Sequence, residues 1–102
     1  MAGIEFTQPF ADDVRRQVEL LASSDEWARV VALAQEIVML QERLATFPEV
    51  GRTLLGDDGQ TLRRIALARV PYFVWYRYDR SADVVRFAHL FHAHQRTPRP
   101  RL

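Results

Sequence analysis

The stretch that decides the fold reads YFVWYRY from Tyr72 to Tyr78, DRSAD from Asp79 to Asp83, and VVRFAHLF from Val84 to Phe91. Aromatic and β-branched residues dominate the first and third segments, which are therefore predicted β-strands. The polar segment between them is short and is predicted to form a hairpin loop. Two strands joined in this way run antiparallel.

Alternation along these segments predicts which side chains share a face, because successive residues of a strand point to opposite sides. Upstream of Pro71, residues 62–69 also alternate, with Ile65 and Leu67 set against Arg64 and Ala66. We therefore expect a meander of three antiparallel strands. In the last strand, one face is predicted to hold Val85, Phe87, His89 and Phe91, and the other Val84, Arg86, Ala88 and Leu90.

The N-terminal half has the period of helices. Residues 3–6 form a short predicted strand, and Thr7-Gln8-Pro9 is a helix start, since proline is tolerated in the first turn. Ser23 and Glu26 have the spacing of a capping box, which predicts a second helix that ends before Pro48. Its predicted buried stripe consists of Trp27, Val30, Val31, Ala34, Ile37, Val38 and Leu44.

A helical hairpin over residues 8–46, followed by antiparallel strands, is typical of an α+β fold. The chain has 102 residues, enough for one domain, which we assign to residues 1–95, with an Arg/Pro-rich tail at 96–102. The absence of cysteine excludes disulfides and thiolate metal sites. No apolar run approaches the roughly 20 residues of a membrane span, and the N-terminus lacks the features of a signal peptide. We therefore expect a cytoplasmic protein.

The net charge of +1 conceals a segregation of charge along the chain. Residues 1–50 contain four arginines and nine acidic residues, whereas residues 51–102 contain ten arginines and four acidic residues. Every basic residue is arginine, a preference that base composition of the source genome can explain. The segregation itself predicts a basic surface on the C-terminal part of the fold, suited to a polyanion or an acidic partner.

Five segments together resemble the RelE/ParE toxins of type II toxin–antitoxin systems. Residues 70–79 contain a Pro-Tyr-hydrophobic-Tyr-Arg pattern, and residues 84–92 form a last strand that ends in His92. Residues 47–51 match the Pro-x-x-Gly turn after the second helix. The remaining similar segments are the start of the first helix at residues 6–13 and the basic segment at residues 94–98. The resemblance covers residues 4–98.

The resemblance implies a toxin that forms a hetero-oligomer with a cognate antitoxin. The RelE branch implies cleavage of mRNA on the ribosome, and the ParE branch implies inhibition of DNA gyrase without catalysis. We expect the first activity, with gyrase inhibition as the alternative and an inactive or nucleic-acid-binding member of the fold as a further one. No cofactor and no metal are expected.

RNA cleavage by attack of the 2′-hydroxyl needs a base, an acid and positive charge near the phosphate. Arginine is always protonated, so a histidine would have to move the proton. We expect His92 to do so, with Arg86 and Arg96 on the phosphate. Contacts to RNA or another target are expected from Arg64, Arg77 and His94.

Two features bear on these expectations. His89 is assigned to packing, because it shares a predicted face with Phe87 and Phe91, and His92 lies three residues further on, facing the other side. The two imidazoles are therefore not expected to share a metal.

The lysine pair and C-terminal tyrosine typical of the RelE branch are absent from this sequence. Inhibition of gyrase therefore stays open as the alternative function.

Overall fold

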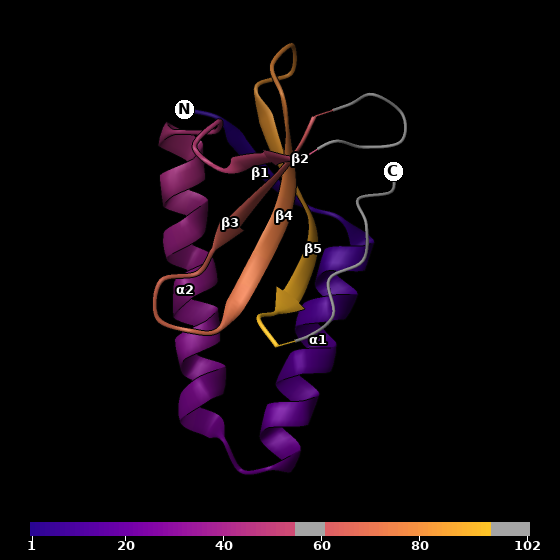
Figure 1. Ribbon diagram of the computed structural model, residues 1–102, viewed down its shortest axis with the longest axis vertical. Coiled ribbons are helices and arrows are strands. Elements are labelled where there is room, and N and C mark those ends of the chain that lie inside the picture. The colour runs from indigo at the N-terminus through magenta and orange to yellow at the C-terminus, as the bar shows by residue number, and fades with distance from the viewer. Residues whose placement is uncertain (55–60, 95–102) are drawn as a thin grey trace.

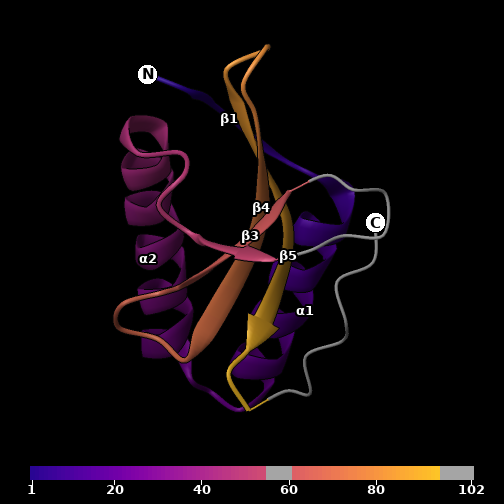
Figure 2. The same cartoon turned by 45° about the horizontal axis from the view of Figure 1, so that its top comes forward.

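The computed structural model describes residues 1–54 and 61–94. Two helices lie side by side against one face of a single sheet, and the hairpin between the last two strands projects beyond the rest of the molecule (Figure 1, Figure 2). The elements in chain order are β1 (Gly3–Phe6), α1 (Gln8–Ser23), α2 (Trp27–Thr46), β2 (Arg52–Leu54), β3 (Leu62–Ala66), β4 (Tyr72–Asp79) and β5 (Val84–His92). The predicted α+β class is confirmed.

The sheet has five strands in the order β1-β5-β4-β3-β2. β1 pairs with β5 in parallel, and the other neighbours are antiparallel. The meander therefore has four strands rather than the three predicted. The additional strand, β2, has only three residues and no alternation of its own, and it is extended because it pairs with β3.

The core lies between the sheet and the two helices. α1 contributes Phe10, and the strands contribute Ile65, Tyr72, Val74, Tyr76, Val85, Phe87 and Leu90. On α2 the buried apolar side chains are Leu33, Ile37, Leu40 and Leu44. No helix in the described ranges has the length and apolar character needed to cross a bilayer.

The predicted buried stripe of α2 was only partly correct. Ile37 and Leu44 are buried, but Trp27, Val31 and Val38 are 58%, 54% and 54% exposed. The helix has apolar residues on more than one side, so periodicity alone could not identify the side that meets the sheet. The side of α2 that packs on the sheet carries Leu33, Ile37, Leu40 and Leu44, which are spaced three or four residues apart.

The capping-box prediction was wrong, although the predicted start of α1 was right. Thr7 caps α1, and its hydroxyl accepts a hydrogen bond from the Phe10 amide. Ser23 is the last residue of α1 and does not cap α2. Instead, Asp25 adopts a φ of 55°, and the amides of Asp25 and Glu26 bond to carbonyls of the last turn, Ala22 and Leu21. This Schellman-type ending reverses the chain without a glycine.

A bulge in β5 changes the predicted faces of that strand. Trp75 lies opposite His89, but the next residue, Tyr76, lies opposite Phe87, so Ala88 is the extra residue. An extra residue exchanges the two faces beyond it. Val85, Phe87 and Leu90 therefore face the core, whereas His89 is turned to the other face, which we call the open face. The prediction that His89 shares a face with Phe87 was wrong.

Candidate functional site

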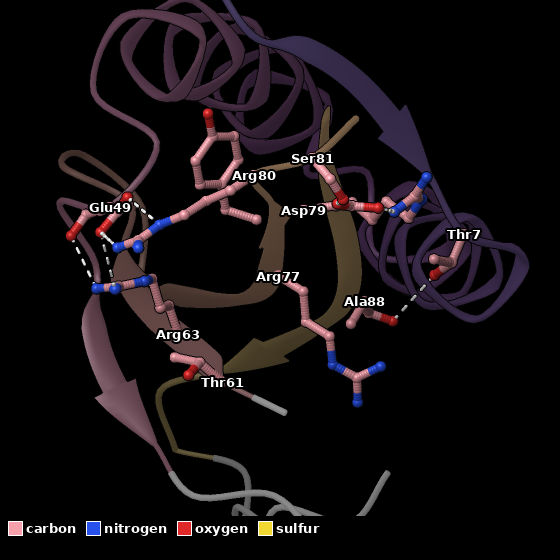
Figure 3. Close-up of a pocket in the computed structure, with 11 residues that line it drawn as sticks. Thr7, Glu49, Thr61, Arg63, Arg77, Asp79, Arg80, Ser81 and Ala88 are labelled. Atoms are coloured by element: carbon pink, nitrogen blue, oxygen red, sulfur yellow. Dashed lines mark hydrogen bonds and ion pairs between the residues drawn. The ribbon is translucent and has the colours of Figure 1, made fainter. Parts of the chain in front are cut away.

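A concavity of about 810 Å³ lies where the open face of the sheet meets the β4–β5 hairpin (Figure 3). It is rich in charge: four arginines and two carboxylates line it. β4 and β5 supply Arg77, Asp79 and Arg86, and the loops around them supply Glu49 and Arg80. The complete lining comprises Thr7, Glu49, Thr61, Arg63, Arg77, Tyr78, Asp79, Arg80, Ser81, Arg86 and Ala88.

One ion-pair cluster joins the loop after α2 to the hairpin. Arg80 donates from Nε to Glu49 Oε1 at 2.9 Å and from Nη2 to Glu49 Oε2 at 2.7 Å. Arg63 lies 3.5 Å from the same carboxylate and donates to the carbonyls of Glu49 and Gly51 at 2.8 and 3.0 Å. The hydrogen bond from Arg80, aided by the charges of Arg80 and Arg63, lowers the pKa of Glu49.

A second cluster joins β5 to β1 and to the end of β4. Arg86 donates to Glu5 at 2.9 Å and to Asp79 at 3.2 Å. Asp79 also accepts hydrogen bonds from the Ser81 hydroxyl and the Ala82 amide, and with Arg86 these lower the pKa of the Asp79 carboxyl. The positive charge of Arg86 is therefore already balanced within the protein.

A buried tyrosine fixes the loop that carries Glu49. Tyr76 is fully buried, and its hydroxyl accepts a hydrogen bond from the Gly51 amide at 2.8 Å. Burial raises the pKa of Tyr76, so the ring stays neutral. Because Gly51 also accepts from Arg63, this contact positions the first ion-pair cluster.

The lowered pKa of Glu49 predicts a loss of stability in acid. A carboxyl whose pKa is lower folded than unfolded stabilises the protein above its unfolded pKa, and the contribution disappears as pH falls through the folded value. We expect the free energy of unfolding of the wild type to fall as pH drops below about 4.5, the ordinary value for Glu49. Urea unfolding between pH 3 and 7 measures this loss.

Glu49→Gln should show a smaller acid-induced loss, because glutamine cannot titrate. Glu19→Gln, on the exposed side of α1, is the matched control and should retain the wild-type profile. Parallel profiles for wild type and Glu49→Gln would contradict the assignment of this pH dependence to the Glu49 cluster.

The structure separates the residues that the sequence grouped into one catalytic site. Arg86 lines the concavity, whereas His92 lies at the end of β5 with its ring 5.0 Å from that of Tyr72, on the core side. His94 is exposed, and its amide donates to His92 Nδ1 at 3.1 Å. Arg96 lies outside the described residues. His92 and Arg86 are therefore not brought together.

The two predicted contact arginines occupy different places. Arg77 lines the concavity, between the Glu49–Arg80 pair and Ala88 (Figure 3). Arg64 lies over the ring of Phe73, 4.9 Å from its centre, and is not part of the concavity lining. The contact between Glu49 and Arg80 was not predicted from the sequence, because it joins residues 31 positions apart.

His89 has an unexpected environment on the open face. Its Nδ1 lies 3.2 Å from the Asp13 carboxylate, which also accepts a hydrogen bond from the Leu90 amide at 3.0 Å. β1 pairs with β5 only as far as Phe87, so Asp13 of α1 occupies the edge of β5 just beyond that point. The ring of His89 is 6.4 Å from that of Trp75.

Comparison with known proteins agrees with this architecture. A family model described as "ParE toxin of type II toxin-antitoxin system, parDE" matches residues 4–97. The chain belongs to this toxin family. It is therefore the toxin component of a type II toxin–antitoxin system, and an antitoxin is its implied partner. A search of curated proteins found no match.

Proposed function

We propose that this toxin acts without catalysis, by binding DNA gyrase. The observation that carries the proposal concerns the charged side chains that line the concavity and their capacity to accept a proton. Of the six charged side chains that line it, the two carboxylates are held in hydrogen bonds that keep their pKa values low, Glu49 by Arg80 and Asp79 by Ser81, Ala82 and Arg86. A carboxylate held in this way is a weak base, and arginine cannot serve as one.

The position of the predicted base supports the same proposal. The lining of the concavity in the described part of the chain includes no histidine, and His92 packs beside Tyr72 on the other side of the sheet. General acid–base catalysis requires the base within hydrogen-bond reach of the proton that it removes. Arg86, the predicted phosphate contact, is instead engaged with Glu5 and Asp79.

The family description favours gyrase as the target. The match is to ParE toxins, the branch whose resemblance implies gyrase inhibition. A surface of arginines and carboxylates in fixed pairs suits recognition of another protein, where charge complementarity gives specificity. In this reading, Arg77 and the β4–β5 hairpin contact the target.

Cleavage of mRNA on the ribosome is the second candidate, and one observation favours it. His89 and Arg77 both lie on the open face, and a carboxylate holds the His89 imidazole in place. A base oriented by a third group is the usual arrangement of an acid–base site. In this alternative the proton would be moved by His89 rather than by His92.

Induction of the chain in bacterial cells, with pulse-labelling of DNA and protein synthesis, tests the proposal. We expect DNA synthesis to stop before protein synthesis. His89→Gln and His92→Ala should both retain toxicity, because a contact surface tolerates the loss of a single imidazole. If protein synthesis stops first and His89→Gln abolishes this arrest, the toxin is a ribonuclease and gyrase is not its target.

A further inference from the structure

The four arginines of the concavity are not equivalent. Arg63, Arg80 and Arg86 each have a carboxylate or carbonyl partner within the protein. Arg77 has no ion pair or hydrogen-bond partner for its guanidinium among residues 1–54 and 61–94, and Figure 3 shows it standing between the two clusters. Within the described residues, Arg77 is therefore the arginine of the concavity whose guanidinium has neither a carboxylate nor a carbonyl partner.

Arg77 is also partly removed from water. Its Nε is buried and has no hydrogen-bond partner in the described structure, and the same is true of the Trp75 indole nitrogen. The two residues are two positions apart on β4, so they point to the same face of the sheet. Buried donors without an acceptor are rare in proteins and each calls for an explanation. Arg77 as a whole is only partly buried and lines the concavity, so a ligand that supplies oxygen atoms there would provide acceptors for its guanidinium.

The neighbours of Arg77 indicate which ligand fits. A nucleic acid strand presents a phosphate at every nucleotide, and successive phosphates would meet the charged carboxylates Glu49 and Asp79. A protein segment can instead present one carboxylate to Arg77 and leave those acidic residues undisturbed. The bidentate Glu49–Arg80 pair shows this geometry within the same concavity.

We propose that Arg77 binds a side-chain carboxylate from an acidic segment of a partner protein. The planar guanidinium would donate two parallel hydrogen bonds, and the carboxylate would balance its charge. The proposal goes beyond the choice between gyrase and ribosome, since it concerns the ligand chemistry of the concavity. The antitoxin that family membership implies is a partner able to supply such a segment.

Titration of the ¹⁵N-labelled full chain with a hexaglutamate peptide, followed by NMR, tests this site. The Arg77 Nε–H resonance is assigned from its absence in Arg77→Gln, and the Trp75 indole resonance is a second reporter. Both should shift and saturate with hexaglutamate, and neither should shift with hexaglutamine. Because hydrogen bonds to charged groups are strong, Arg77→Gln should weaken peptide binding roughly tenfold or more.

Arg15→Gln is the matched control, because it removes the same charge from an exposed position on α1 and should leave peptide affinity unchanged. The backbone spectrum reports whether each variant is folded. Equal weakening by both variants would reduce the effect to overall charge and overturn the proposal, as would an unmoved Arg77 resonance. Tighter binding of inorganic phosphate or a deoxythymidine dodecamer at Arg77 would overturn the choice of carboxylate.

Discussion

Replacing Phe87 with alanine is expected to lower the free energy of unfolding by about 3–5 kcal/mol. Phe87 is fully buried, and its ring lies 5.2 Å from those of both Phe6 and Phe10. The side chain therefore joins β5 to β1 and α1, and its removal leaves a cavity where three elements meet. Urea unfolding monitored by circular dichroism measures the loss.

Phe91→Ala is the matched control for this prediction. Phe91 lies four residues further along β5, and without the bulge at Ala88 it would share the core face with Phe87. The bulge places it on the open face, half-buried beside Trp75 at 4.8 Å. We expect Phe91→Ala to lower the free energy of unfolding by only about 1 kcal/mol. Equal losses for the two variants would contradict the observed register of β5.

The bulge marks the limit of what could be predicted from this strand. The composition of residues 84–91 correctly indicated a strand, because β-forming side chains are recognisable locally. The extra residue, Ala88, follows from the pairing of β5 with β4 and from contacts at its other edge. There Thr7 donates to the carbonyls of Phe87 and Ala88, 80 and 81 residues away in the sequence. No local pattern encodes such contacts.

The helices show the same division between local and distant causes. The start of α1 was predictable, because Thr7 and the proline two residues later act within one turn. The reversal at Asp25 was not, because a left-handed residue at a helix end is usually glycine. The side of α2 that packs on the sheet was also missed, since several faces of that helix carry apolar residues.

The candidate site divides in a similar way. The excess of arginine in the C-terminal half predicted a basic surface, and two of the four arginines that line the concavity, Arg77 and Arg86, were singled out individually. The partners that neutralise Arg86 could not be predicted, because Glu5 is 81 residues away. As a result, we predicted more positive charge for contact with a phosphate than the concavity has available. We also did not predict the carboxylates that line it.

Replacing Gly51 with alanine is expected to destabilise the protein by about 1–3 kcal/mol, the usual cost of overpacking. A Cβ at this position would lie 2.7 Å from both Cε1 and the hydroxyl oxygen of Tyr76. The tyrosine ring is fully buried in the core and has little freedom to move away. The chain would have to shift at Gly51, and the hydrogen bond from its amide to Tyr76 would weaken.

Gly3→Ala separates this steric effect from the general effect of losing a glycine. A Cβ at Gly3 would lie 3.5 Å from the nearest atom of Val84, an ordinary contact. Where alanine fits, it stabilises by about 0.4–1 kcal/mol, because the unfolded chain loses freedom. Urea unfolding of both variants should therefore give changes of opposite sign. A Gly51→Ala variant as stable as the wild type would show that the Gly51–Tyr76 contact does not hold the loop that carries Glu49. Arg80 and Arg63 would then need another anchor for their shared carboxylate.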